Sequence, residues 1–552
     1  MADGPCEICQ QVTQGTCSTC RQVYYCSKEH EHEHKEIHQV SCNPFEIGTS
    51  KELGRYLLAT RNLKPSDVIL SETPLVFGPK PQQIKEGPFP CVGCCRILTD
   101  QTCERCPLCL WPVCKLDCPG LKQPNIHGFE CTILRLKPAN TESKSFYEYF
   151  RFDVLIALRA LALQNSSLKR WETMLALEAH PEHRGPDTDV YKAIEEKIKI
   201  MEDNYLKPLR ESEKQCGESI LKDTSPHLIH KVYGILDVNA TELTEEIEAM
   251  VLYPTASLLE HNCVPNTMQT IDEKENFRIT FRAALPIKKG EHITSTYTNI
   301  LWGTSARRDH LKQTKYFTCK CRRCQDPTEL GTYFSALRCL GDEENCPCGG
   351  TQLPVNPTEE DCVWVCERCK IQLPDKEMMN FVNHLNTEVD RVMSRRSKIA
   401  ELEGVLSKLL NFLHENHYLN YIIKHSLVQL YGNEGNGEIS ASLLTMKLKM
   451  CQDLIEITRK IDPGNARLSL YMGVLLNEQF IGKFKMITRM HEKEKKVDAG
   501  KLQEALNILE ENKRVLKYEI NTTSGARLFN VVCKNEDQLK SWIESNDLKA
   551  YV

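Results

Sequence analysis

Cysteine is the residue type that departs most from an average composition, with 28 cysteines in 552 residues. Many stand two residues apart, the spacing with which a chain supplies two thiolate ligands to one tetrahedral zinc ion. Most fall into four groups, in residues 6–42, 91–131, 263–324 and 339–369. The first residues lack the basic and apolar stretches of a signal peptide, so we interpret the cysteines as metal ligands of an intracellular protein rather than as disulfides.

The first group holds eight zinc-type ligands within about forty residues. Its interleaved pairs predict a cross-braced finger with two zinc ions. Because the stretch has few large apolar side chains, metal binding must supply much of its folding free energy. One ion is expected at Cys6, Cys9, Cys26 and His30, and the other at Cys17, Cys20, His38 and Cys42.

The second group repeats this arrangement and predicts two more zinc ions. Cys95 and Cys103 remain as spare thiols, and an exchange of Cys94 for Cys95 stays open. The expected ligand sets are Cys91, Cys94, Cys114 and Cys118 for one ion, and Cys106, Cys109, His127 and Cys131 for the other.

The group in residues 339–369 predicts one ribbon-like zinc site. Cys366 and Cys369 form a pair that would be completed by two of Cys339, Cys346 and Cys348, of which Cys339 and Cys348 are the working choice. A buried role without metal for some of these thiols is the alternative.

Apolar patterning predicts the elements between these groups. Residues 53–79 and the segment from residue 277 show short β-rich runs broken by turns, which predict antiparallel strands. Residues 146–253 have apolar positions at helical spacing. Residues 375–552 contain a single proline and many leucines at helical spacing, which predicts an all-helical domain with a buried leucine core, for which stacked TPR-like hairpins are one arrangement.

Three segments carry a resemblance to a known family: YPTASLLEHNCVPN at 253–266, RAALPIKKGEHITSTYTN at 282–299 and YFTCKCRRC at 316–324. Together they resemble the core of a SET-domain protein lysine methyltransferase, and the first two cysteine groups resemble MYND zinc fingers. The order of these motifs is similar to that of the SMYD family, most of all its arthropod-specific SmydA branch. The resemblance covers roughly residues 1–370.

The resemblance implies an α+β multidomain fold with zinc-stabilised MYND fingers, a β-rich SET core and a helical C-terminal domain. The expected boundaries are residues 1–43 for an N-terminal MYND-type finger and 44–330 for a split SET domain. Within the SET domain lie an internal finger at 91–131, a helical insert at 146–250 and a post-SET zinc site at 319–324. A zinc ribbon at 331–374 and the helical domain at 375–552 follow.

The resemblance also implies the chemistry, which is transfer of a methyl group from S-adenosylmethionine to a lysine amine. Tyr297 matches the tyrosine beside the transferring methyl group and is the candidate catalytic residue. The post-SET zinc would take Cys263, Cys319, Cys321 and Cys324, for a total of about five to six zinc ions. The candidate cofactor-binding residues are Gly54, Arg55, Glu260, His261, Asn266, Tyr297 and Phe317.

Four positions depart from the family pattern. Glu260 replaces a cofactor-contacting asparagine, Leu53 a basic residue, Tyr56 the second glycine of a GRG-type turn, and Lys315 an aromatic residue that walls the lysine channel. Two hypotheses follow. One is an active lysine methyltransferase of histone or non-histone proteins, and the other is a weak or inactive SET/MYND scaffold that binds partners through its fingers and helical domain.

Charge and hydropathy limit the classes of partner that the protein is expected to bind. Lys and Arg number 70 against 75 Asp and Glu, which argues against strong nucleic-acid binding. No apolar run reaches membrane-spanning length, so no membrane role is expected. The expected partners are a protein substrate with a target lysine and Pro-containing peptides on the MYND fingers, with a monomer favoured. A role in chromatin, transcription or signalling, in the nucleus, the cytoplasm or both, is the corresponding expectation.

Overall fold

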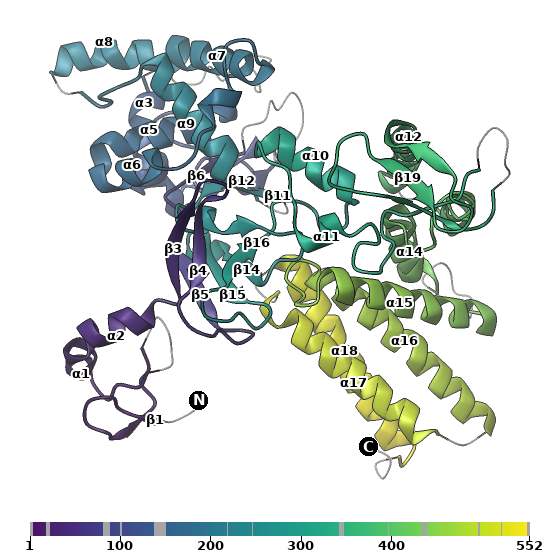
Figure 1. Cartoon of the computed structure of the whole chain (residues 1–552). Helices are drawn as coiled ribbons and strands as arrows, with labels where there is room; N and C mark the ends of the chain where they lie inside the picture. Colours follow the sequence, from purple (N-terminus) through teal and green to yellow (C-terminus); the bar gives the residue numbers. More distant parts are fainter. Residues whose placement is uncertain are drawn as a thin grey trace.

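The computed structural model arranges the chain as a mixed helix-and-sheet protein in which a sheet-rich centre is flanked by helical regions and an N-terminal finger (Figure 1). The C-terminal helices form one arm and the helices of the insert form another. The structure describes residues 4–17, 23–80, 89–99, 102–136, 151–217, 219–244, 247–341, 347–395, 397–432, 439–494, 497–519 and 522–548.

The N-terminal finger is built from very short elements. Strands β1 (Gly4–Pro5) and β2 (Val12–Thr13) pair as a hairpin, and helices α1 (Lys28–Glu33) and α2 (Lys35–Cys42) follow. Helix α1 begins at Ser27, whose hydroxyl accepts a hydrogen bond from the backbone N–H of His30. Every residue of α1 is at least partly exposed, so this finger has little apolar core.

The centre of the molecule consists of three small sheets. Strands β3 (Phe45–Ser50) and β4 (Gly54–Ala59) form a hairpin, which β16 (His292–Ser295) and β13 (Glu260–His261) extend in the order β13-β16-β4-β3. The second sheet joins β14 (Thr267–Asp272), β15 (Arg278–Ala283) and β5 (Val68–Glu72), and the third joins β11 (Thr241–Thr244), β12 (Glu248–Leu252) and β6 (Val76–Pro79). Their inward side chains form one apolar core.

Strand β13 is the short element that matters most for the site. It pairs with β16 in parallel, with Glu260 opposite Thr294 and His261 opposite Ser295. Parallel neighbours require a long crossover, and here the crossover is formed by β14 and β15. The EHNCVPN segment is thereby brought beside the end of β16, where Tyr297 follows.

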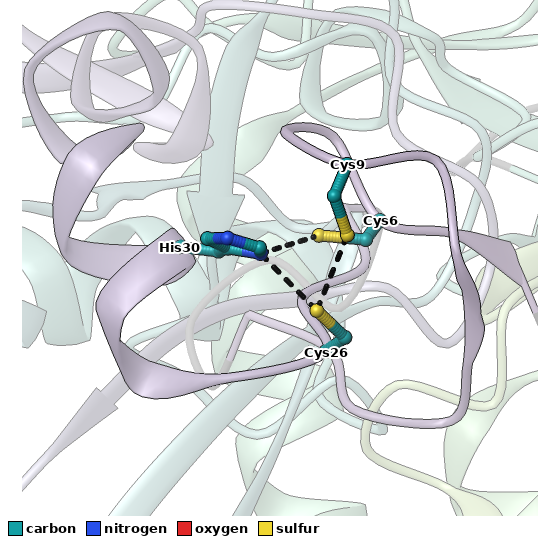
Figure 2. Close-up of side chains that lie close together, drawn as sticks. All are labelled: Cys6, Cys9, Cys26 and His30. Atoms are coloured by element: carbon teal, nitrogen blue, oxygen red, sulfur yellow. Dashed lines mark hydrogen bonds between the residues drawn. The ribbon is translucent and has the colours of Figure 1, made fainter.

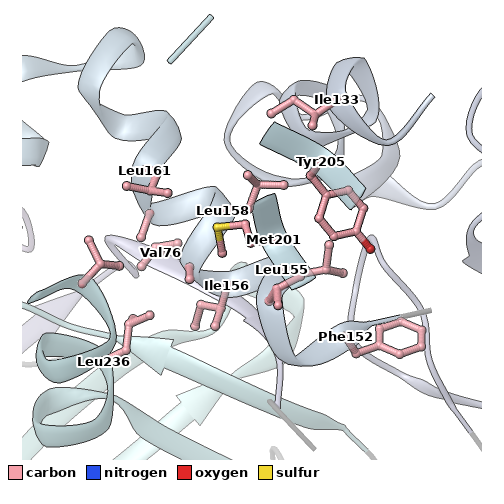
Figure 3. Packing of buried hydrophobic residues seen from close by; sticks show 14 of the residues in the cluster. Val76, Ile133, Phe152, Leu155, Ile156, Leu158, Leu161, Met201, Tyr205 and Leu236 are labelled. Atoms are coloured by element: carbon pink, nitrogen blue, oxygen red, sulfur yellow. The ribbon is translucent and has the colours of Figure 1, made fainter. Parts of the chain in front are cut away.

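The internal cysteine-rich segment shares a core with the insert. It contains β7 (Phe89–Pro90), β8 (Ile97–Leu98), β9 (Glu104–Arg105), β10 (Pro112–Val113) and α3 (Phe129–Leu134). The insert adds α5 (Leu155–Ser166), α6 (Leu168–Leu175), α7 (Asp189–Met201), α8 (Lys207–Cys216) and α9 (Pro226–Asn239). Figure 3 shows Ile133 of the finger, Val76 of β6, and Leu158 and Met201 of the insert in one buried cluster.

The insert differs from the sequence-based expectation at its end. Helix α9 ends at Asn239, and Thr241–Thr244 and Glu248–Leu252 form β11 and β12, where the sequence predicted a helical stretch to residue 250. Helical and strand spacings are hard to separate in so short an apolar run. Pairing of β12 with both β6 and β11 decides in favour of strands, because it satisfies the backbone on two sides.

The chain continues from the central sheets through α10 (Thr304–Thr314) and α11 (Arg322–Gln325) into a four-stranded ribbon. Its strands are β17 (Leu337–Arg338), β18 (Thr351–Pro354), β19 (Val363–Cys366) and β20 (Gln372–Pro374). The described residues that follow form α-helices, as the leucine spacing predicts: α12 (Asp375–Met393), α13 (Ile399–Leu409), α14 (Tyr418–Leu430), α15 (Ala441–Ile461), α16 (Ser469–Glu494), α17 (Ala499–Val515) and α18 (Thr523–Ser545). Among the described helices, none combines the length and apolarity needed to cross a membrane.

Candidate functional site

Figure 2 shows the first ligand set of the N-terminal finger, in which Cys6, Cys9, Cys26 and His30 converge. His30 Nδ1 lies 3.5 Å from Cys6 Sγ and 3.1 Å from Cys26 Sγ, and Cys9 Sγ lies 3.4 Å from Cys26 Sγ. Ligands on a tetrahedral zinc ion with bonds of about 2.3 Å lie about 3.8 Å apart. The spacing therefore fits a shared ion.

The second ligand set of this finger is described in part. Cys17 Sγ and Cys42 Sγ lie 3.5 Å apart, although 25 residues separate them in the chain. His38 is buried on α2. The fourth predicted ligand, Cys20, lies outside the described residues.

The internal finger brings its eight predicted ligands together in two groups. In one, Cys91 Sγ lies 3.9 Å from Cys118 Sγ, and Cys94 Sγ lies 3.7 Å from Cys114 Sγ. The neighbouring Cys95 is fully buried and belongs to the apolar core of the central sheets, whereas Cys94 is the thiol that lies with the other three ligands. In the other group all four ligands are buried, namely Cys106, Cys109, His127 and Cys131.

A chain of buried charges holds the histidine of the second internal group. His127 Nε2 faces Cys109 Sγ at 3.4 Å, while its Nδ1 lies 2.9 Å from Glu130 Oε1. Arg159 of α5 donates two hydrogen bonds to Glu130 and others to the carbonyl oxygens of Phe77 and Val92. Burial alone would raise the pKa of Glu130, but Arg159 and His127 bring it below its usual value. A carboxylate of this kind fixes the orientation of a metal-binding histidine.

Sequence reasoning missed Glu130 and Arg159. Glu130 follows His127 by one helical turn, which was an available clue. Arg159 lies 29 residues after Glu130 within the apolar run of α5, where a lone arginine gives no indication of its partner.

The cysteines expected at the post-SET site do lie together. Cys263 Sγ is 3.9 Å from Cys319 Sγ and 3.5 Å from Cys324 Sγ, and Cys321 completes the group. Arg307 Nε donates to Cys263 Sγ at 3.2 Å. Because four thiolates around Zn²⁺ carry a net charge of about −2, a buried guanidinium is a suitable counter-charge.

The ribbon holds a fifth group. Cys339 Sγ lies 3.6 Å from Cys369 Sγ, and Cys348 Sγ lies 3.5 Å from Cys366 Sγ. These are the working ligands chosen from the sequence, whereas Cys346 lies outside the described residues. Cys362 is not among the ligands, since its thiol faces Asp375 Oδ1 at 3.8 Å.

Tyr297 lies just after β16, next to the post-SET cysteines. Its hydroxyl donates a hydrogen bond to the carbonyl oxygen of Leu259, and its backbone N–H donates to His261 Nδ1 at 3.0 Å. That bond leaves His261 Nε2 to carry the proton, and Nε2 lies 3.3 Å from Cys263 Sγ. Burial raises the pKa of Tyr297, so its hydroxyl stays protonated at neutral pH.

The remaining candidate cofactor residues differ in their contacts. The Phe317 ring lies 6.1 Å from that of His261 and is 38% exposed. Gly54 has a φ of +67°, with no atom within 4 Å of the place a Cβ would take, and Arg55 donates to the carbonyl oxygen of Ala176 at 2.6 Å. Asn266 bonds the backbone of β16 at His292 and Thr294, so its amide joins two strands.

Two departures from the family pattern contact the same histidine. Glu260 Oε2 pairs with His292 Nδ1 at 2.9 Å, and the Tyr56 ring stacks on His292 with centroids 4.6 Å apart. The Tyr56 ring also lies across Gly48 of the opposite strand, at the place a Cβ would occupy. The changes at 56 and 260 are therefore packed as one unit, whereas Leu53 is 53% exposed.

Lys315 follows the last residue of α10. Its Nζ donates to the carbonyl oxygen of Val238 in α9 and lies 5.9 Å from the centroid of the Tyr297 ring. Burial lowers the pKa of this amine, while Asp237 and Glu242 act in the opposite direction. The cation thus lies beside the candidate catalytic residue.

Comparison with known proteins agrees with this architecture. The SET domain family matches residues 54–298, and the MYND finger family matches residues 6–42. This combination of a MYND finger and a SET domain in one chain supports the SMYD family that the sequence resemblance indicated.

The sequence is similar to SET domain-containing protein SmydA-8, isoform A, of Drosophila melanogaster, at 29% identity over 359 residues that cover 63% of this chain and 70% of that protein. Histone-lysine N-methyltransferase ASHR1 of Arabidopsis thaliana is 24% identical over 364 residues, 62% of this chain and 67% of the relative. N-lysine methyltransferase SMYD2-A of Xenopus laevis is 25% identical over 240 residues, 41% of this chain and 50% of the relative.

Proposed function

We propose that this protein is an S-adenosylmethionine-dependent protein lysine N-methyltransferase with Tyr297 at its reacting centre. The observation that carries the proposal is the convergence of three distant segments on one point. Tyr297 follows β16, His261 bonds its backbone, and Phe317 approaches His261 from the post-SET segment. Relatives named as lysine methyltransferases support the same class of reaction.

The residues present fit the cofactor. Phe317 offers a partly exposed aromatic face, on which a purine can stack. Gly54 leaves open space at the turn after β3, where a bound molecule can approach the backbone. Glu260 is only partly buried, and its carboxylate can accept a hydrogen bond from an ammonium group, with His292 sharing its charge. When bound, S-adenosylmethionine supplies an electrophilic methyl group on a sulfonium.

The chain itself supplies orientation. The hydroxyl of Tyr297 is protonated and fixed by the Leu259 carbonyl oxygen, so its dipole has one preferred direction. Because its hydrogen is engaged by Leu259, the Tyr297 oxygen can accept a hydrogen bond from the acceptor amine and orient it, and only the neutral amine can attack the methyl group. His261 links the tyrosine to the zinc-binding cysteines, so loss of that ion is expected to release the tyrosine as well.

The five cysteine and histidine groups are proposed to hold zinc, with a sixth ion at Cys17, His38 and Cys42 together with Cys20. The proposed acceptor is a lysine of a protein, histone or not, and the proposed role is regulation of transcription or signalling. The exposed N-terminal finger is proposed to capture partner peptides that contain proline.

Calorimetric titration of zinc-replete full-length protein with S-adenosylmethionine tests the proposal. We expect saturable binding that falls at least tenfold in Phe317→Ala, because the stacking face is lost. Tyr471→Ala is the matched control, since Tyr471 is 39% exposed on α16, and it should bind like the unchanged protein. No heat and no melting shift at millimolar cofactor would favour the second candidate function, a scaffold without transferase activity.

The scaffold is the second candidate because of one specific contact. The Lys315 amine lies beside Tyr297, where a lysine methyltransferase has to admit the amine of its substrate. Two like charges in a partly buried space repel each other strongly. Binding of S-adenosylmethionine distinguishes the two candidate functions, because a scaffold without transferase activity does not require the cofactor.

A further inference from the structure

Lys315 has an unusual set of contacts for a charged residue. Its Nζ donates to the Val238 carbonyl oxygen near the end of α9 and lies 5.9 Å from the Tyr297 ring centroid. Val238 lies 77 residues earlier in the insert, whereas Tyr297 belongs to the SET domain, so the amine bridges these two parts of the molecule. A lysine at a helix end normally reaches solvent, yet this one is directed inward.

The neighbouring residues hold the segment in this position. The backbone N–H of Lys315 donates to the carbonyl oxygen of Leu311, which closes the last turn of α10. The next residue, Tyr316, adopts a φ of +59°, and its ring stacks on His183 with centroids 4.8 Å apart. Arg184 donates to the Tyr316 hydroxyl at 3.3 Å. The backbone around Lys315 is thus fixed from the insert side, which leaves its side chain few other directions.

We propose that Lys315 is a specificity-determining residue that keeps its own amine at the entrance to the acceptor position, where it competes with the lysine of a substrate. The inference rests on the proposed function, because Tyr297 marks the acceptor position only if the protein is a methyltransferase. An incoming lysine must first displace Lys315 from the Val238 carbonyl oxygen. A substrate that makes only weak contacts with the rest of the protein therefore cannot displace Lys315 and is not methylated.

The charges around Lys315 support a displaceable residue rather than a permanent ion pair. Asp237 and Glu242 are the acidic groups that stabilise its charge. Asp237 pairs with Arg184, and Glu242 pairs with Lys80 at 2.6 Å. Burial lowers the pKa of His310, and the charge of Lys315 acts in the same direction. The described contacts of Nζ are one carbonyl oxygen and one aromatic face, which an arriving peptide can replace at modest cost.

Amine labelling tests the position of Lys315 without any cofactor. Full-length, zinc-replete protein is treated briefly with an amine-acetylating reagent, and modification is counted by peptide mass spectrometry. Lys320 is the matched control, because it lies five residues away and is exposed. We expect Lys315 to react at least ten times more slowly than Lys320. Equal rates would show that the amine is free in solution and would overturn the inference, whether or not the cofactor binds.

Methyl transfer tests the competition itself. With labelled S-adenosylmethionine and mixed core histones as the probe acceptor, Lys315→Met should raise kcat/KM about tenfold through a lower KM, and the affinity for the cofactor should not change. Lys315→Arg, which keeps a cation, should not show this gain. Lys312→Met is the control on the exposed face of α10, where Lys312 pairs with Glu360.

The outcomes separate the two proposals. Cofactor binding together with an unchanged KM in Lys315→Met would overturn the competitor role and leave the transferase proposal standing. Absence of cofactor binding in every variant would overturn the transferase proposal and, with it, the competitor role that depends on it. A gain of transfer in Lys315→Met alone would support both.

Discussion

The N-terminal finger and the internal finger have nearly the same ligand spacing and opposite relationships to the rest of the chain. In the N-terminal finger, Cys9 and Cys26 are exposed and the residues of α1 reach solvent. In the internal finger, Cys91, Cys109 and Trp111 have no exposed surface and belong to the core of the insert. The same zinc chemistry therefore forms a nearly independent module in one place and part of a domain core in the other.

The physical cause is the amount of apolar surface each finger can bury. A finger of about forty residues with few large apolar side chains depends on its metal ions for stability. The internal finger adds Phe89, Trp111, Ile133 and Leu134 to a cluster that includes α5 and α9. We therefore expect the shared core, rather than metal binding, to supply most of the stability of the internal finger. We infer that partner proteins bind to the N-terminal finger, because the internal finger has much less exposed surface.

The largest effect is expected from Arg159→Met. This change leaves Glu130 buried without its cation, and breaking such a pair costs about 3–5 kcal/mol. Urea unfolding followed by circular dichroism measures the loss. Arg170→Met is the matched control, because Arg170 of α6 donates to the backbone at Pro74 and Leu75 without a carboxylate partner among its described contacts. A loss for Arg159→Met no larger than for the control would contradict the internal finger's place in the core.

An intermediate effect is expected from limited zinc chelation. The ion proposed at Cys6, Cys9, Cys26 and His30 should leave first, because two of these ligands are exposed. Native mass spectrometry counts the ions while a melting curve reports the SET centre. Loss of the first ion should change the midpoint temperature of the main melting transition little, and loss of later ions should lower this temperature by several degrees. Loss of the main transition with the first ion would mean that the two fingers do not differ as described.

The smallest global effect is expected from Cys26→Ser. Loss of this ligand should release the N-terminal finger and change the unfolding free energy of the remaining chain by less than about 0.5 kcal/mol. Hydrogen exchange, read peptide by peptide, should rise in residues 23–42 and stay constant in the insert. Cys109→Ser in the internal finger is the contrasting variant, since its exchange should rise throughout the insert. Spread of faster exchange from Cys26→Ser into β3 and β4 would show that the fingers are coupled.

Much of the site was accessible from ligand types and spacing. The pairs around Cys6 and Cys91 define their own partners, because a tetrahedral ion needs four ligands and the chain offers them nearby. Cys263 was different, since its partners begin 56 residues later and only the family resemblance connected them. The helical C-terminal region was likewise predictable, because its leucine spacing extends over many turns.

The misplaced end of the insert shows where sequence patterns fail. The apolar spacing in residues 241–252 is compatible with either a helix or a strand. Pairing of β12 with β6 stabilises the strand. The buried ion pairs could not be predicted from the sequence for a related reason. The role of Arg159 or Arg307 depends on a carboxylate partner in another element. The linear sequence does not indicate which residue that partner is.

The sequence by itself determined the local chemistry: which thiols and imidazoles can share a metal ion, where the long helices lie, and which motif holds Tyr297. Short-range spacing suffices for these features, because ligand geometry and helix periodicity act over a few residues. Only the tertiary structure decided what surrounds the tyrosine. The contacts of Lys315 with Val238 and of Glu260 with His292 join segments brought together by sheet pairing and core burial, and these depend on the packing of the whole chain.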